Sequence, residues 1–161
     1  AIDPQLARSR LQEQLPPGFR LLSAAAVPVA GPSLALEVEA ARWRIDLAPA
    51  PQAADGDRQS PWPDQTAWEA AVAALLAADS LPWHDTDKKG RPRQRDCRPA
   101  LEALSLITWE PTQVTLGLRA SVDAAGRSLR PEQLKHWLAE RLETELALGA
   151  LCRESLQLRA C

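Results

Sequence analysis

The densest group of chemically capable side chains in this sequence is basic. Six of the chain's 19 lysines and arginines fall between positions 88 and 98, a segment with one acid, Asp96, although the whole chain carries a net charge of −2. Guanidinium groups form two-pronged hydrogen bonds with phosphates and carboxylates, so charge gathered in this way predicts an anionic partner. The six residues are Lys88, Lys89, Arg91, Arg93, Arg95 and Arg98.

Three of these arginines occupy every second position: Arg91, Arg93 and Arg95. Residues two apart in a β-strand point to the same face, so the three would form a row that can follow phosphates. Trp83, nearby in the sequence, could stack on an unpaired base. Two other interpretations stay open, namely a surface that docks a protein, or charge that keeps an edge strand from aggregating. Pro92 also indicates an edge strand.

The next residues, Asp96-Cys97-Arg98-Pro99, allow two arrangements. Asp96 and Arg98 could form a local ion pair that orders the start of the following strand. Alternatively, Arg98 could project with the arginine row into a common binding surface. The spacing of the two residues is compatible with both arrangements.

Residues suited to catalysis or metal binding are few and scattered. The two histidines, His84 and His136, lie 52 positions apart, and no Cys-x-x-Cys motif occurs. Strands of equal length around position 90 would place His84 opposite Cys97 within one residue of register, as a cysteine nucleophile and its base require. A ribbon histidine and an inward-facing cysteine explain the same pattern. We therefore predict no catalytic residue and no metal site in this chain.

Alternating and apolar runs predict the strands that position these residues. The basic segment belongs to a two-stranded ribbon that turns at Lys88-Lys89-Gly90, and a second hairpin turns at 110–113. In residues 42–47 the apolar side chains share one face. The predicted strands cover residues 19–27, 42–47, the ribbon at 83–97, 101–109, 114–120 and 151–158.

Capping signals and apolar residues at helical spacing predict the helices. Asp3-Pro4 begins a short helix that ends near residue 14, and Ser33 caps a helix through Arg42. Thr66 and Glu69 form a capping box for a helix to residue 80, with a buried stripe of Trp68, Val72, Leu75 and Leu76. Pro131 begins the last helix, which buries Leu134, Trp137, Leu138 and Leu142.

These elements predict an α+β protein, with helices packed on one face of an antiparallel sheet and a ferredoxin-like order. Residues 1–14 would form an N-terminal helix or lead-in, and 15–161 a single domain. A flexible proline-rich loop is predicted at 48–63. The sequence has no Met, no Tyr, one Phe and six Trp, so the core must combine Leu, Ala and Val with tryptophan.

Cysteine usage and hydropathy predict the compartment. Three widely spaced cysteines, Cys97, Cys152 and Cys161, favour a reduced, cytoplasmic protein over a disulfide framework. No apolar run reaches the roughly 18 residues that a membrane span needs, so no membrane partner is expected. Because the chain begins at Ala1 and contains no methionine, we expect it to be a piece of a longer polypeptide.

Four short blocks, in order, resemble a known family. They are Leu15-Pro16-Pro17-Gly18-Phe19-Arg20-Leu21-Leu22, then Ser33-Leu34 with Glu39-Ala40-Ala41, then Gly90 through Asp96-Cys97-Arg98-Pro99-Ala100-Leu101, and Ser128-Leu129-Arg130-Pro131-Glu132-Gln133-Leu134. Together they cover residues 15–158 and resemble the C-terminal portion of the radical SAM-linked domain of unknown function, DUF2344. Cys97 departs from the family, which usually has a branched aliphatic residue there, and the family's N-terminal half is not in this chain.

The resemblance implies an accessory role. In that family the domain follows a radical SAM core or is encoded beside it, often with a cobalamin-binding-like domain ahead. It implies a 4Fe–4S cluster, S-adenosylmethionine and, with the latter domain, cobalamin for the linked region, and no cofactor in this chain. It also implies a radical SAM partner in cis or in trans and an RNA or ribosome-related substrate. We therefore expect a non-catalytic substrate-recognition domain with a basic hairpin, or a protein-docking module of that enzyme.

Overall fold

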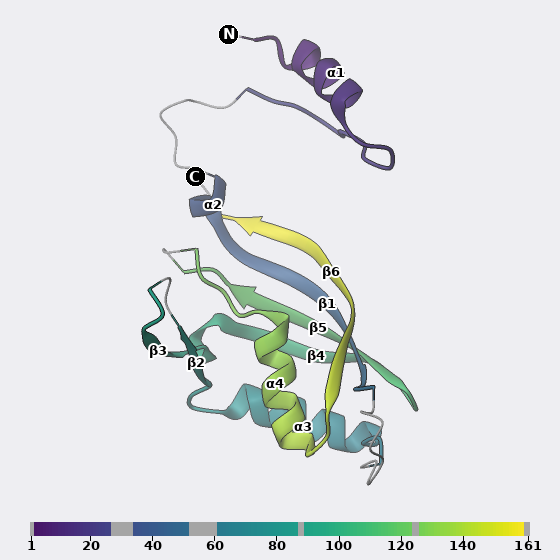
Figure 1. Ribbon diagram of the computed structural model, residues 1–161, viewed down its shortest axis with the longest axis vertical. Coiled ribbons are helices and arrows are strands. Elements are labelled where there is room, and N and C mark those ends of the chain that lie inside the picture. Colours follow the sequence, from purple (N-terminus) through teal and green to yellow (C-terminus); the bar gives the residue numbers. More distant parts are fainter. Residues whose placement is uncertain (1, 27–33, 52–60, 87–88, 124–125, 160–161) are drawn as a thin grey trace. The chain divides into compact units, whose positions relative to one another are not determined.

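The computed structural model describes residues 2–26, 34–51, 61–86, 89–123 and 126–159. The chain divides into two compact units, residues 1–33 and residues 34–161, and each is described by itself (Figure 1). The predicted division between residues 14 and 15 stays a prediction. None of the helices in the described part of the chain combines the length and the apolar character needed to cross a membrane.

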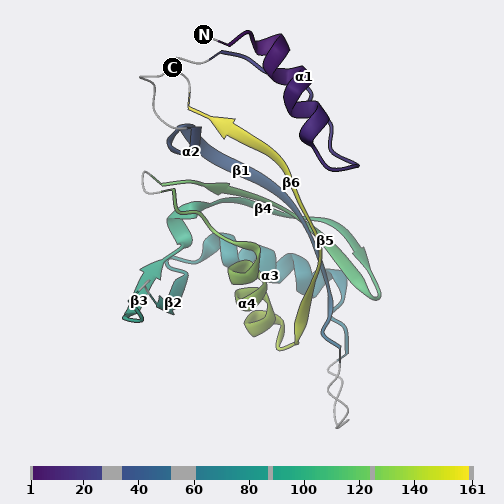
Figure 2. The same cartoon turned by 45° about the horizontal axis from the view of Figure 1, so that its top comes forward.

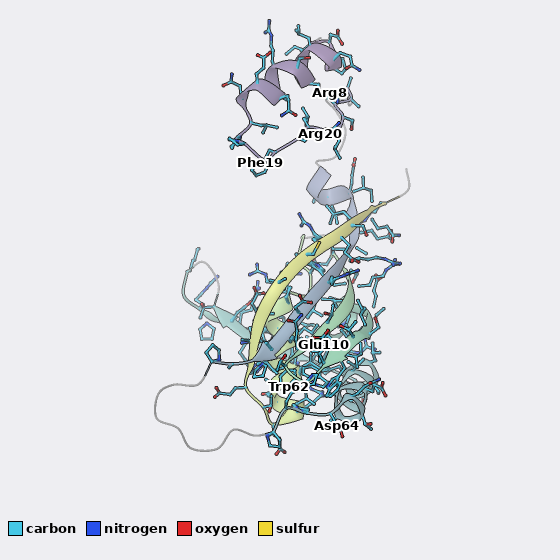
Figure 3. All side chains as sticks on the ribbon, turned by 90° about the vertical axis from the view of Figure 1, so that its right-hand side faces the viewer. Arg8, Phe19, Arg20, Trp62, Asp64 and Glu110 are labelled. Atoms are coloured by element: carbon cyan, nitrogen blue, oxygen red, sulfur yellow. The ribbon has the colours of Figure 1, made fainter. Side chains whose placement is uncertain are left out.

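The first unit contains helix α1 (Pro4–Gln14), which begins as predicted. The carboxylate of Asp3 accepts a hydrogen bond of 3.0 Å from the N–H of Gln5 and caps the helix. Gln12 then holds the returning chain, because its amide donates to the Phe19 carbonyl and accepts from the N–H of Leu21. The predicted strand at 19–27 is wrong over its described residues, 19–26, which form no strand. Phe19 is 66% exposed and packs into no core (Figure 3).

The second unit is built on a four-stranded antiparallel sheet in the order β4-β5-β1-β6. Helices α3 and α4 pack on one face of this sheet (Figures 1 and 2). The chain order β1-α3-β4-β5-α4-β6 is the ferredoxin-like pattern, so the predicted α+β class is confirmed. The bounds are β1 Val38–Pro49, α3 Gln65–Ala77, β4 Leu101–Glu110, β5 Gln113–Ser121, α4 Pro131–Leu142 and β6 Leu146–Leu158.

The core lies between the sheet and the two helices. Strand β5 alternates strictly, with Val114, Leu116 and Leu118 buried on the helix side. Trp68 of α3 and Leu134 of α4 are fully buried against this face. The predicted core of leucine, alanine and valine with tryptophan is therefore confirmed, and burial of its apolar surface is the main stabilising contribution.

The predicted helix at 33–42 is wrong over most of its length. Helix α2 spans only Leu34–Glu37, and β1 begins at Val38; Ser33 lies outside the described residues. Ala40 and Ala41 pair with β5 on one side and with β6 on the other. Two ladders of backbone hydrogen bonds and burial in the sheet centre outweigh the helix propensity of alanine.

The segment before α3 also differs from prediction in detail. Ala48 and Pro49 of the predicted loop at 48–63 belong to β1, and residues 52–60 lie outside the described part of the chain. Helix α3 is capped by Asp64, whose carboxylate accepts from the N–H of Ala67, and not by Thr66 (Figure 3). The N–H of the Trp62 indole donates to the Glu110 carbonyl at 3.0 Å. This bond ties the start of α3 to the β4–β5 turn.

Candidate functional site

The basic ribbon predicted from the sequence is a hairpin of β2 (Pro82–Thr86) and β3 (Pro92–Asp96). It is inserted between α3 and β4 as a separate two-stranded sheet. Trp83 pairs with Arg95, and Asp85 pairs with Arg93. These four side chains therefore share one face, as the alternation predicts, while Arg91 precedes the strand.

Asp96 and Arg98 anchor the end of this hairpin. The Asp96 carboxylate accepts from the N–H groups of Arg98 (2.9 Å) and Leu81 (2.8 Å). These two bonds hold the pKa of the carboxyl below its usual range. The turn that follows, η1 (Arg98–Ala100), leads directly into β4.

Arg98 takes neither of the two arrangements considered from the sequence. Its guanidinium donates to the carbonyls of Ala78 (2.9 Å), Leu101 (2.9 Å) and Leu76 (2.7 Å). Two of these carbonyls stand at the C-terminal end of α3, where helical acceptors have no partner within the helix. Arg98 thus ties α3 to the start of β4 and points away from the arginine row.

A groove with a volume of about 1410 Å³ opens beside the arginine face of the hairpin. One wall is the hairpin, with Lys89, Arg91, Arg93 and Arg95. The opposite wall is formed by Val122 and by residues Gly126–Gln133, and the floor is the part of the sheet formed by β1 and β6. We call this space, lined by these three segments, the basic groove.

The sheet topology explains why these segments meet. β1 begins where β6 and β5 end, as the pairs Val38 with Leu158 and Ala40 with Ser121 show. β4 begins at this same end of the sheet, since Leu101 pairs with Ala120. The hairpin precedes β4 and the loop after Ser121 follows β5, so both emerge at one end of the sheet.

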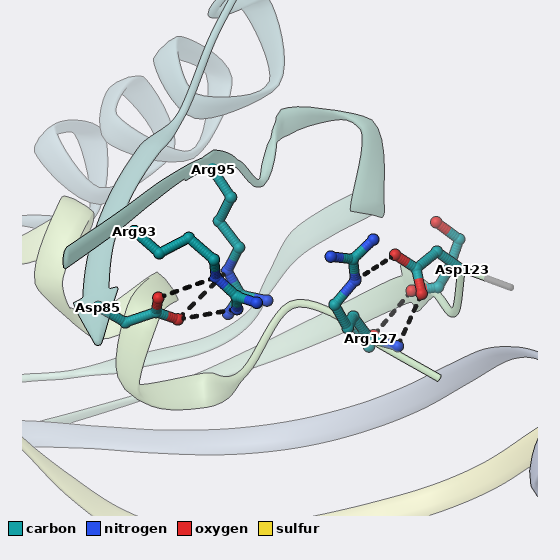
Figure 4. Close-up of polar contacts among 7 residues, drawn as sticks. Asp85, Arg93, Arg95, Asp123 and Arg127 are labelled. Carbon is teal, nitrogen blue, oxygen red and sulfur yellow. Dashed lines mark hydrogen bonds and ion pairs between the residues drawn. The ribbon is translucent and has the colours of Figure 1, made fainter. Parts of the chain in front are cut away.

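Asp85 organises the hairpin wall (Figure 4). The Arg93 guanidinium donates to both Asp85 oxygens, at 3.2 and 3.3 Å, and the Arg95 Nε lies 3.8 Å from Oδ2. This Nε is shielded from solvent and makes no hydrogen bond to any residue that the structure describes. A buried donor without an acceptor is costly to the folded state.

The opposite wall presents Arg127 and Arg130. Asp123 accepts from the backbone N–H of Arg127 at 2.9 Å and from its Nε at 2.7 Å, which orders the side chain facing the hairpin wall (Figure 4). Arg130 precedes α4, and its N–H donates to the buried Gln133 side chain. The N-terminus of α4 therefore also opens on the groove and adds partial positive charge.

The floor of the groove contains Trp43 and Arg153, which pair across β1 and β6. The Arg153 guanidinium carbon lies 5.6 Å from the centroid of the Trp43 ring, a cation–π contact. Sequence reasoning missed Arg127, Arg130, Arg153 and the groove-lining role of Trp43. Isolated in the sequence, these arginines carry no local signal, whereas the alternation at 42–47 already placed Trp43 on the face that becomes the floor.

Cys97 and His84 do not meet. His84 pairs with Gln94, while Cys97 donates its N–H to the Leu81 carbonyl at 2.9 Å. Cys97 is buried, and burial raises the pKa of its thiol. Among the described residues, no group of three or more His, Cys, Asp or Glu side chains is placed to hold a metal ion.

The structure thus brings most of the predicted binding residues to one place. Lys89, Arg91, Arg93, Arg95 and Trp83 line the basic groove. Arg98 binds the carbonyls described above, and Lys88 lies outside the described residues.

Comparison with known proteins bears on the first 146 residues. A family model described as "Uncharacterized protein conserved in bacteria (DUF2344)" matches residues 1–146. No curated protein matches the sequence. A solved structure titled "Crystal Structure of a Cbf5-Nop10-Gar1 Complex" is similar over 76% of this chain and 32% of its own chain, with a TM-score of 0.45 and 12% identity. The chain spans about a third of the length of that solved chain.

Proposed function

This chain belongs to the family of uncharacterized proteins conserved in bacteria, DUF2344, and on that premise we propose that it is a non-catalytic substrate-recognition domain that binds RNA through the basic groove. The hairpin supplies one wall of that binding surface. The ligand lies between this wall and the segment that leads into α4.

The charge of the groove is the observation that carries this proposal. Seven basic and two acidic side chains line it, although the whole chain has a net charge of −2. Concentrated positive charge in a concave surface attracts polyanions and orients them before contact.

The size of the groove favours a polymer over a small molecule. Pockets for small ligands enclose roughly 300–1,000 Å³. The basic groove, at about 1410 Å³, exceeds that range and is lined by arginines from three separate segments. A chain of regularly spaced phosphates can contact all three segments at once, which one phosphate group cannot.

We further propose that this recognition serves a radical SAM enzyme. The resemblance of the sequence to a radical SAM-linked domain supports this association. The 4Fe–4S cluster, S-adenosylmethionine and any cobalamin would be held by the linked region, in the cytoplasm. The gene and its neighbours test this part: we expect one of them to encode a radical SAM core with its cysteine triplet. Absence of such a core from both would contradict the association.

Salt-dependent binding of a ten-nucleotide oligouridylate, U10, tests the RNA proposal. For single strands, each phosphate contact contributes about −0.7 to the slope of log K against log salt concentration. The double variant Arg93→Gln/Arg127→Gln removes one arginine from each wall. We expect it to bind U10 more weakly and to have a slope shallower by about 1.4.

A matched control carries the same charge change on the other face of the sheet. Arg42 and Arg44 alternate with Trp43 along β1, and Arg44 pairs with Glu154 on that face. Arg42→Gln/Arg44→Gln should retain the wild-type slope. Equal losses in both double variants, or no U10 binding at 50 mM salt, would contradict the RNA proposal and leave protein docking or protection of an edge strand as the role of the basic hairpin.

A further inference from the structure

Apart from Arg153, the floor of the basic groove is apolar, in contrast to its walls. Val38 and Trp43 of β1 and Leu151 and Leu156 of β6 line it. Helices α3 and α4 cover the rest of this sheet face, while the floor is the part that faces the groove (Figures 1 and 2). A ligand that offered only phosphates would leave these apolar side chains uncovered.

Resting on the proposed function, we propose that Trp43 and Arg153 form a stacking platform for an unpaired base, so that the RNA in the groove is single-stranded. A double helix presents phosphates and sugars and keeps its bases stacked inside. A single strand offers both phosphates and unpaired bases. Its phosphates can meet the arginine walls while a base lies on the apolar floor.

The geometry of the pair suits this role. Trp43 is half-buried, with one part packed against the core and another lining the groove. Arg153 lies over its ring, with its guanidinium carbon 5.6 Å from the ring centroid. Indole rings and guanidinium planes both stack on bases, and the two residues stand side by side on paired strands.

Trp83, the aromatic residue that the sequence suggested for stacking, has other contacts. Its ring lies 5.4 Å from that of His136 and 6.0 Å from that of Trp137, nearly perpendicular to both. Both partners belong to α4. Trp83 therefore fastens the hairpin wall to the helix, and Trp43 is the aromatic residue of the floor.

Binding of U10 is compared with binding of inorganic polyphosphate, which carries phosphates without bases. Trp43→Leu should weaken U10 binding about 5- to 150-fold, the range for loss of one base–aromatic stack. It should leave polyphosphate binding within twofold of wild type. Trp43→Phe, which retains an aromatic ring, should restore part of the loss. Trp62→Leu replaces a half-buried tryptophan outside the groove lining and should leave both ligands unaffected.

Arg153→Lys keeps the proposal testable if Trp43→Leu fails to fold. Lysine preserves the charge but lacks the planar guanidinium, so U10 binding should fall while polyphosphate binding stays the same. Equal losses of affinity for the two ligands in these variants would overturn the base platform and leave the proposed function standing. If neither ligand binds, the proposed function itself is wrong.

Discussion

Asp85 and Arg93 lie directly opposite each other on the two strands of the basic hairpin, and the carboxylate accepts two hydrogen bonds from the guanidinium. The same carboxylate lies 3.8 Å from the Nε of Arg95. One acid therefore orders two arginines of the wall and also places a negative charge beside them. Any anionic ligand of the groove has to approach this carboxylate, which gives Asp85 a measurable effect on affinity.

Replacing Asp85 by asparagine should strengthen binding of polyanions. The change removes a repulsive charge, and exposed pairs of this kind contribute little to stability, about 1 kcal/mol or less. We expect Asp85→Asn to bind U10 about two- to fivefold more tightly at 50 mM salt, measured by fluorescence anisotropy. Glu154→Gln, which removes an acid on the other sheet face, should leave the affinity unchanged. Weaker binding by Asp85→Asn would show that the acid acts mainly by positioning the arginines.

Replacing Arg98 should destabilise the fold without affecting the groove. Arg98→Gln removes three hydrogen bonds from a charged donor to carbonyls of Leu76, Ala78 and Leu101. We expect the free energy of unfolding in urea to fall by about 2 kcal/mol or more. The affinity of the folded fraction for U10 should match wild type.

Two comparisons sharpen this prediction about Arg98. Arg98→Lys should recover only part of the stability, because one ammonium group cannot reach three carbonyls in fixed directions. Arg44→Gln, an exposed arginine on the other sheet face, should change stability by about 0.5 kcal/mol or less. A selective loss of U10 binding by Arg98→Gln at full stability would mean that Arg98 contacts the ligand.

Asp96 should make the stability of the hairpin end depend on pH. Its pKa is lowered in the folded protein, so its contribution is present above the unfolded value of about 4 and is lost as the pH falls through the lower folded value. Asp96→Asn keeps an acceptor oxygen but cannot titrate. In urea, wild type should therefore have a higher free energy of unfolding than the variant at pH 7. This difference should shrink as the pH falls to 2.5. A constant difference across this range would contradict the assignment.

Cys97 should behave as a buried core residue and not as a nucleophile. Because burial raises its thiol pKa, its contribution to stability is present below the unfolded value of about 8.5 and is lost as the pH rises through the folded value. Iodoacetamide at pH 7.5, followed by peptide mapping, should modify the exposed Cys152 much faster than Cys97. In Cys97→Ala this part of the alkaline loss of stability should disappear. Rapid native-state alkylation of Cys97 would contradict this prediction.

Local patterns were sufficient for most of the elements. The strict alternation in residues 114–120 and the apolar spacing in α4 predict structures that form as expected, because each pattern matches a period of the backbone. The helix predicted at 33–42 failed for the opposite reason. Alanine favours a helix locally, but Ala40 and Ala41 pair with strands more than 70 residues away in the sequence. Such long-range pairing leaves no local signal.

The candidate site also combines features that local sequence predicts with features that depend on long-range contacts. The sequence by itself determined that Arg93 and Arg95 share one face of a hairpin, because side-chain direction along a strand is a local property. Only the tertiary structure decided that Arg98, three positions after Arg95, turns to the carbonyls at the end of α3. It also decided that arginines from two distant segments, with Trp43, complete the groove. The physical reason is the antiparallel sheet, which brings the start of β1 and the ends of β5 and β6 together beside the hairpin.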